Sequence, residues 1–188
     1  MIEYYNRLPR YVYINKERFI INTDYRIFIN FEYDMQGADV RKAVENALIN
    51  FYPAFFKICE KGLLNEAIDK FIWFYQCGKE EYKNKDIANK KGKKVSQIFN
   101  YKYDCDLICG SFWIYGHIDL HKYCHWWKFK EVWNNLPNDC EFCKIKSYRA
   151  YDGKDKDMIE LKEYYKLPPT EAEIKEQIRK DKIYEAFK

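Results

Sequence analysis

Cysteine and histidine are the residue types in this chain whose spacing could support chemistry. They form two cysteine pairs and one histidine series, namely Cys105 with Cys109, Cys140 with Cys143, and His117, His121 and His125. Residues four apart on a helix share one face. A structural zinc ion takes four Cys or His ligands in tetrahedral geometry. One functional interpretation is therefore a zinc site joining three helices, in a zinc-stabilised structural protein.

Ordinary packing is the alternative for the same residues. A free cysteine behaves as a small buried apolar residue. The Cys140-x-x-Cys143 pair lacks the Gly-containing knuckle of zinc ribbons, and no second such pair accompanies it. No βαβ pattern surrounds it either, which disfavours thioredoxin-like chemistry. We therefore expect no cofactor, although the sequence leaves open whether Cys105, Cys109, Cys140 and Cys143 bind metal.

Sequence motifs of catalysis are missing. The chain has no Gly-x-Ser-x-Gly elbow, no Gly-x-x-x-x-Gly-Lys loop and no His-Glu-x-x-His motif. Asp104 and Asp106 could be paired acids, but the helix dipole also favours Asp at a helix start. Trp126 and Trp127 could stack on bases, although core packing is the simpler role. These observations favour a binding protein over an enzyme.

The net charge of +4 is concentrated in one polar stretch. Residues 79–94 hold seven Lys against three acidic residues, 7 − 3 = +4, so the rest of the chain sums to zero. A nucleic-acid groove binder normally spreads basic residues over a folded face. We interpret the stretch as a solvated lysine-rich loop. A nucleic-acid-binding regulator acting through this loop is an alternative function, but nucleic acid is not the expected partner.

Composition and targeting signals indicate a cytosolic globular protein. The chain has 188 residues, of which 47% are apolar and 19% aromatic, enough for one domain with an aromatic core. The N-terminus lacks the apolar run of a signal peptide. No stretch approaches the roughly 18 apolar residues that span a bilayer. Seven cysteines without a secretion signal suit a reducing cytosol.

Hydrophobic periodicity predicts a mainly α fold with a small N-terminal β-hairpin. The hairpin pairs residues 11–14 with 18–21 around Asn15-Lys16-Glu17. The predicted helices begin at Thr23 or Asp24, near Asp39, at Leu64, at Asp104, at residue 119 (running to 136) and near residue 138. Residues 1–150 then form a helical domain, and residues 151–188 a charged helical extension.

The extension ends in a predicted helix with few apolar residues. Thr170 and Glu173 form a capping box that opens it. Its apolar residues are Ile174, Ile178, Ile183 and Phe187, and we expect the three isoleucines on one stripe. Such a helix buries little by itself. These four residues are therefore the candidate partner-binding residues, for a client or for self-association, against the alternative of a solvated terminal helix.

Short motifs in a fixed order carry a resemblance to a known family. They are Leu8-Pro9, Ile21-Asn22-Thr23-Asp24-Tyr25-Arg26, Phe51-Tyr52-Pro53, the run Phe71 to Glu80, Tyr103-Asp104, Tyr115-Gly116, Ile118-Asp119-Leu120, His125-Trp126-Trp127-Lys128-Phe129, Leu136-Pro137 and Tyr148-Arg149. Over about residues 8–150 the chain resembles the bacteriophage gene-product-fifteen family of phages or prophages of Gram-positive hosts. The Asn15-Lys16 turn departs from the common Asn-Gly of that family.

The resemblance implies a protein encoded among tail genes, with the usual role of a tail-assembly chaperone. Such a factor binds the tape-measure protein and keeps it soluble while the tail tube polymerises. Other tail-assembly proteins, and a second copy of the chain, are further expected partners. The family offers no catalytic residues to carry over. The implied location is the host bacterial cytosol, with no cofactor and no membrane.

Overall fold

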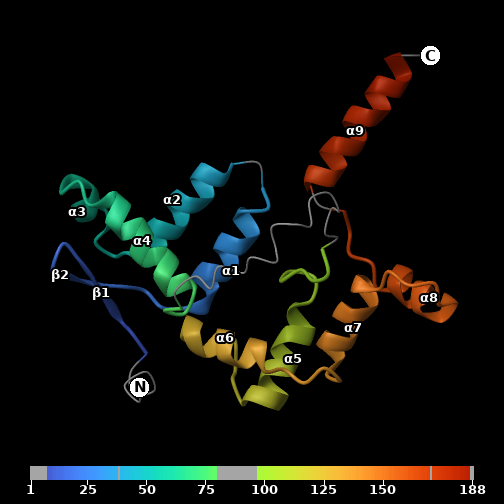
Figure 1. Cartoon of the computed structure of the whole chain (residues 1–188), viewed down its shortest axis with the longest axis horizontal. Coiled ribbons are helices and arrows are strands. Elements are labelled where there is room, and N and C mark those ends of the chain that lie inside the picture. Colours follow the sequence, from blue (N-terminus) through green and yellow to red (C-terminus); the bar gives the residue numbers. More distant parts are fainter. Residues whose placement is uncertain (1–7, 38, 80–96, 170, 187–188) are drawn as a thin grey trace.

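The computed structural model of the chain describes residues 8–37, 39–79, 97–169 and 171–186. These ranges form nine helices and one two-stranded antiparallel sheet (Figure 1). The predicted mainly α fold with an N-terminal hairpin is confirmed. Within these ranges, no helix combines the length and the apolar content that a membrane span requires.

The hairpin is built from β1 (Tyr11–Ile14) and β2 (Glu17–Ile20), with Ile14 paired to Glu17. Its turn is one residue tighter than predicted, since Glu17 belongs to the strand. Asn15 and Lys16 both have positive φ, 47° and 63°, as a two-residue type I′ turn requires. The Glu66 carboxylate accepts hydrogen bonds from the Asn15 amide at 2.9 and 3.0 Å. The turn is therefore tied to the helical body.

Four helices follow the hairpin: α1 (Tyr25–Asp34), α2 (Val40–Phe51), α3 (Phe55–Glu60) and α4 (Leu64–Tyr75). Asp24 and Asp39 accept hydrogen bonds from first-turn amides of α1 and α2, as N-cap residues do. Pro53 follows the end of α2, as predicted. The six-residue α3 was not predicted. It is too short to show a helical period, and no side chain caps its start.

The second half of the body contains α5 (Cys105–Gly116), α6 (Trp126–Asn134), α7 (Glu141–Ala150) and α8 (Lys156–Tyr164). The predicted helix over residues 119–136 is wrong in its first part, because residues 117–125 are not helical. Their aromatic and apolar residues mimic a helical pattern. Their hydrogen-bonding groups instead pair with the segment that precedes α1, as described below.

Trp126 joins the two halves of the body. Its ring is fully buried and lies 4.8 Å from Phe28 of α1 and 5.7 Å from Tyr75 of α4, nearly parallel to both. Its indole N–H donates to the Tyr75 carbonyl at 2.8 Å, and that of Trp127 donates to the Phe74 carbonyl at 2.8 Å. Carbonyls in the last turn of a helix need such partners. The two tryptophans therefore supply hydrogen-bond donors to carbonyls at the end of α4.

A buried ion pair organises the other end of α5. Both carboxylate oxygens of Asp104 accept hydrogen bonds from the Arg149 guanidinium, at 2.7 and 2.9 Å. Asp104 stands at the predicted N-cap position, but its side chain makes no capping bond to the helix. It also accepts a bond from the Asn100 amide at 2.8 Å, and Arg149 donates to the Tyr165 carbonyl at 2.6 Å. The pair thus connects α5, α7 and the end of α8.

The last helix, α9 (Glu171–Ala186), stands apart from the other elements in Figure 1. The described residues within it are all exposed. At about 100° per residue, the step from Ile174 to Ile178 turns about 40°, but the step from Ile174 to Ile183 turns about 180°. The expectation of a single isoleucine stripe is therefore wrong, and Ile183 lies on the opposite face. Phe187 lies outside the described residues.

The proposed boundary at residue 150 stays a prediction. Across it, α8 packs against α7, and Lys162 donates to the Tyr151 carbonyl at 2.6 Å. The charged region therefore begins with a helix that is attached to the body, and α9 follows it.

Gly116 of α5 lies close to Val132 of α6. A Cβ at this position would lie 2.8 Å from a methyl group of Val132, whereas one at Gly110 would meet nothing within 4 Å. We expect Gly116→Ala to lower the free energy of unfolding by about 1–3 kcal/mol through overpacking. Gly110→Ala is the matched control and should be neutral or stabilising. Urea unfolding of both variants measures the difference, and equal stabilities would contradict the proposed close contact.

Removing one member of the buried ion pair leaves the other charge uncompensated. We expect Arg149→Met to cost about 3–5 kcal/mol of unfolding free energy. The double variant Asp104→Leu with Arg149→Met should recover part of this loss, because neither charge then remains buried. Chemical denaturation of the two variants provides the comparison. A double variant less stable than the single one would show that the charges do not act as a pair.

Candidate functional site: a polar groove between α1 and α2

The segment over residues 21–26 has two chemically different sides. Alternate side chains are buried, namely Ile21, Thr23 and Tyr25. The side chains between them, Asn22, Asp24 and Arg26, are exposed or half-buried. Alternation of this kind is expected of extended chain entering a helix, because successive side chains point in opposite directions. One side of the segment therefore joins the body, and the other faces a groove.

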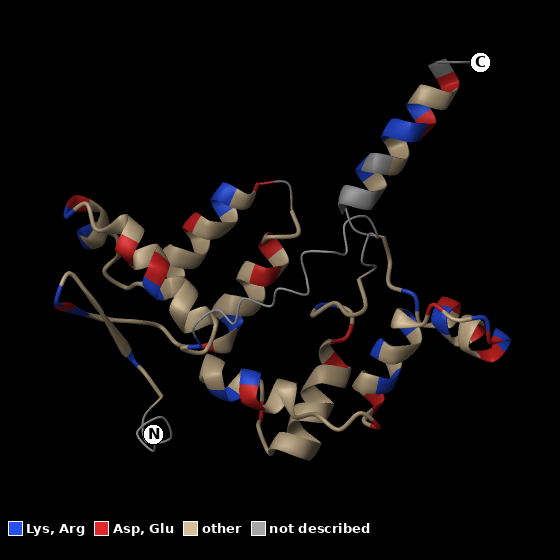
Figure 2. Cartoon of the chain, viewed as in Figure 1, with Lys and Arg blue, Asp and Glu red and all other residues tan. Residues whose placement is uncertain are grey.

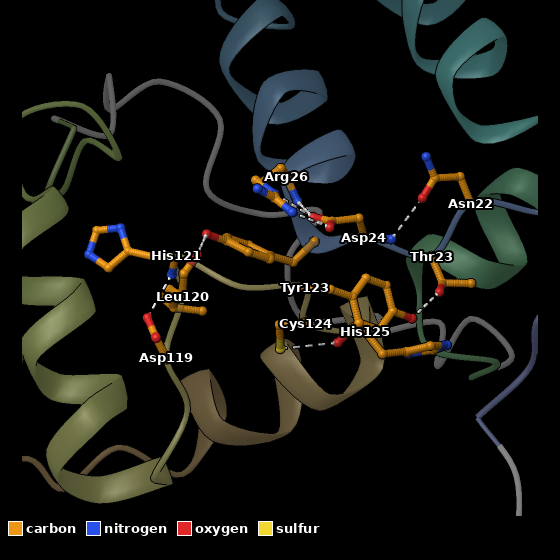
Figure 3. Close-up of polar contacts among 11 residues, drawn as sticks. Asn22, Thr23, Asp24, Arg26, Asp119, Leu120, His121, Tyr123, Cys124 and His125 are labelled. Atoms are coloured by element: carbon orange, nitrogen blue, oxygen red, sulfur yellow. Dashed lines mark hydrogen bonds and ion pairs between the residues drawn. The ribbon is translucent and has the colours of Figure 1, made fainter.

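The buried side contacts the non-helical segment before α6. The hydroxyls of Thr23 and Tyr123 lie 2.6 Å apart (Figure 3). The hydroxyl of Tyr25 donates to the Leu120 carbonyl at 2.7 Å. Burial is the main cause that raises the pKa of Tyr25 to about 12. Its hydroxyl therefore stays protonated at neutral pH and remains a donor.

Main-chain hydrogen bonds reinforce this junction. The Tyr25 amide donates to the Cys124 carbonyl at 2.9 Å, and the Trp126 amide donates to the Thr23 carbonyl at 2.8 Å. Asp24 and His125 thereby form an isolated antiparallel bridge. Residues 120–124 are not helical, and the carbonyls of Leu120 and Cys124 accept hydrogen bonds from Tyr25.

His125 is a buried N-cap for α6. Its Nδ1 accepts a hydrogen bond from the Trp127 amide at 3.1 Å, and its Nε2 lies 3.1 Å from the Pro9 carbonyl. A carbonyl only accepts, so Nε2 carries the proton and the ring is neutral. Burial lowers the pKa of His125, which further favours the neutral form.

On the exposed side, Asp24 and Arg26 form a two-point ion pair (Figure 3). The Arg26 Nε and Nη2 atoms donate to the two carboxylate oxygens at 2.8 and 2.6 Å. Partial burial acts to raise the pKa of Asp24, but the hydrogen bonds and charge of Arg26 hold it below its ordinary value. Both side chains are therefore charged, and both line the groove between α1 and α2.

The groove runs between α1 and α2 and has a volume of about 310 Å³. Its walls are mostly polar, and its apolar lining is limited to Ile27, Phe31 and Ala47. The polar lining residues are Asn22, Asp24, Arg26, Asn30, Asp34, Asn46 and Asn50. This set offers amide donors and acceptors rather than a nucleophile beside a base. The arrangement suits binding through hydrogen bonds.

The cysteines and histidines do not converge on one centre. No group of three or more His, Cys, Asp or Glu among the described residues could hold a metal ion. The Sγ atoms of Cys105 and Cys109 lie 3.9 Å apart near the surface. Burial and the neighbouring Cys105 raise the pKa of Cys109 to about 11, which disfavours the thiolate that metals bind.

The remaining predicted ligands have other surroundings. The sulfur of Cys140 accepts a bond from the Cys143 amide at the start of α7, at 3.4 Å. His121 is exposed, and His125 caps α6. The predicted four-residue series of histidines does not share a helix face, because the segment between α5 and α6 is not helical.

A family model described as Bacteriophage Gp15 protein matches residues 5–169. The chain belongs to this family. No curated protein and no solved structure matches the chain. The resemblance read from the sequence motifs is confirmed, and membership indicates a phage protein of the structural or assembly type. Within this Gp15 protein, the motif over residues 21–26 contributes both to the junction with α6 and to the groove.

The predicted partner-binding residues on α9 and the groove between α1 and α2 are different surfaces of the chain. Ile174, Ile178 and Ile183 are exposed on α9, as a partner-binding role requires. The groove was not predicted, because its two walls meet only in the folded chain. The signal for one wall is nevertheless present in the sequence, as polar residues at four-residue steps on α1, namely Arg26, Asn30 and Asp34.

The neutral state of His125 predicts a loss of stability in acid. The unfolded chain gains a proton on this residue as the pH falls through about 6.5, whereas the folded chain does so only at lower pH. The contribution of His125 to the free energy of unfolding is fully present above about pH 6.5. It is lost as the pH falls through the pKa that His125 has in the folded chain. We expect the free energy of unfolding to fall by about 1 kcal/mol between pH 7.5 and 5.5.

Denaturant titrations at the two pH values test this expectation. His125→Asn keeps a capping side chain and should reduce the pH dependence, although it also weakens the fold. His121→Asn, at an exposed position, is the matched control. A pH dependence that persists unchanged in His125→Asn would contradict the assignment.

Proposed function

We propose that this chain is a non-enzymatic tail-assembly factor that works in the host bacterial cytosol as a chaperone for the tape-measure protein. The observation that carries the proposal is the family match over residues 5–169. A tape-measure protein is long and helical, and it must be shielded until the tube encloses it. A factor with this task needs exposed surface that can contact a client, and the described residues offer such surface on α5 and α9.

The outer face of α5 supports client binding. Trp113 and Ile114 are each 63% exposed, and they share their face of the helix with Gly110, one turn earlier. Asp106 is the only charged residue in this helix, so α5 is almost entirely uncharged in Figure 2. Exposed apolar side chains that lie together are typical of protein-interaction surfaces.

The two-sided α9 also supports contact with partners. Ile174 and Ile178 are 45% and 49% exposed on one face, and Ile183 is 47% exposed on the other. An amphipathic helix commonly docks by placing apolar residues in a groove of its partner. With apolar residues on both sides, α9 suits contacts with the tape measure on one face and another tail protein or a second copy on the other.

Neither alternative function is favoured by a described residue. The lysine-rich stretch, residues 79–94, lies outside the described ranges apart from Lys79. The zinc interpretation would need at least three ligands together, and the described residues contain no such group. We therefore keep the assembly chaperone as the proposed function.

Co-expression with the tape-measure protein tests the proposal directly. We expect the tape measure to aggregate when expressed alone, and to stay soluble and co-purify when expressed with the full chain. Removing residues 168–188 should reduce the co-purified amount, because it removes α9. A tape measure that stays insoluble with the full chain, with nothing co-purified, would contradict the chaperone role.

Point variants separate the two faces of α9. Ile174→Asp with Ile178→Asp changes one face, and Ile183→Asp changes the other. If the tape measure binds one face, one of these variants should lose binding while the other serves as its matched control. Equal and full binding by both variants would show that α9 is not the contact.

A further inference from the structure

We propose that the groove between α1 and α2 binds the main chain of an extended polypeptide segment. The inference deepens the proposed function and rests on it for the identity of the natural client. It goes further in naming the site and the chemistry of recognition. Four asparagine side chains, Asn22, Asn30, Asn46 and Asn50, supply the contacts.

An asparagine side chain is matched chemically to a peptide bond. Each amide offers two N–H donors and one carbonyl acceptor, so it can pair with both groups of a peptide unit. Among the described residues, the side chains of Asn30 and Asn46 have no hydrogen-bond partner. The side-chain amide of Asn50 donates to the main-chain carbonyl of Asn46 at 2.7 Å, and its side-chain oxygen remains as an acceptor. The walls therefore present donors and acceptors toward the groove.

The spacing of these groups fits an extended chain. Asn46 and Asn50 are one turn apart on α2, a rise of about 6.0 Å. Two residues of extended chain span about 6.7 Å. The two asparagines can therefore contact two peptide units that are two residues apart. On the opposite wall, Arg26, Asn30 and Asp34 repeat the same spacing along α1. Eight residues of α1 rise about 12 Å, so the groove holds about four extended residues.

A main-chain hydrogen bond connects the two walls. The main-chain N–H of Asn22 donates to the main-chain carbonyl of Phe51 at 2.8 Å, which places the start of α1 beside the end of α2. The ion pair between Asp24 and Arg26 holds these two lining residues against each other. Ala47 has the smallest side chain among the lining residues. A preformed site of this kind loses little entropy on binding.

The charge of the groove favours polypeptide over nucleic acid. Asp24 and Arg26 neutralise each other, and Asp34 has no ion-pair partner among the described residues. The lining therefore carries a net negative charge, which repels a phosphate backbone. A neutral or basic segment is the compatible ligand. Recognition of the main chain would also tolerate many sequences, which suits a long client with varied segments.

A peptide titration tests the groove without the tape measure. The probe is a peptide of about eight alternating Ala and Ser residues with blocked ends, added to the ¹⁵N-labelled full chain. We expect the side-chain amide resonances of Asn30 and Asn46 to shift, and those of the exposed Asn65 and Asn134 to stay. The same peptide N-methylated at alternate residues lacks half of its main-chain donors and should cause much smaller shifts.

Variants of similar volume complete the test. Asn30→Leu with Asn46→Leu removes the hydrogen-bonding groups and should weaken peptide binding roughly tenfold or more. Asn65→Leu with Asn134→Leu is the matched helical control and should bind as the unmodified chain does. Absence of shifts at Asn30 and Asn46, equal shifts with the N-methylated peptide, or equal affinity of the two double variants would each overturn the inference.

Peptide binding and tape-measure solubility, both measured with the unmodified chain, separate this inference from the proposed function. Should the unmodified chain bind the peptide but leave the tape measure insoluble, the groove stands and the chaperone role fails. Conversely, solubilisation of the tape measure without peptide binding would leave the chaperone role in place and remove the groove from it.

Discussion

The contact of Trp126 and Trp127 with the end of α4 is the constraint on which the rest of the body depends. Two indole N–H groups donate to the carbonyls of Phe74 and Tyr75, and the Trp126 ring is stacked with those of Phe28 and Phe129. Large rings bring much apolar area into the core, and their polar edges need partners once buried. Burial of the rings and hydrogen bonding of their N–H groups occur at one place. This contact fixes α6 against α1 and α4 and joins the two halves of the body.

This constraint explains the shape of the segment before α6. His125 caps the start of α6, where Trp126 begins the helix. The non-helical residues 120–124 before it hydrogen-bond to Thr23 and Tyr25. That pairing turns the buried side of residues 21–26 inward and leaves the other side for the groove. The groove and the tryptophan contact are therefore two consequences of one junction. A binding surface held by such a junction is rigid, as a preformed site requires.

Much of the fold could be predicted because its causes are local. The hairpin follows from two β-rich runs around Asn15, and α2 follows from its apolar spacing, the Asp39 cap and Pro53. The predictions that were wrong also share a cause. Residues 119–125 carry a helix-like pattern, yet distant hydrogen bonds decide their shape. Asp104 resembles a cap in the sequence, yet its partner is Arg149, 45 residues away.

The sequence by itself determined the family, the mainly α class and most helix boundaries, since motif order, periodicity and capping are properties of neighbouring residues. Only the tertiary structure decided which polar groups meet. It brought α1 and α2 together so that asparagines from both helices line one groove, and among the described residues it did not gather three or more of the cysteines and histidines that spacing had suggested as ligands. The reason is physical: burial and hydrogen-bond pairing act between residues far apart in the chain, and local patterns do not contain that information.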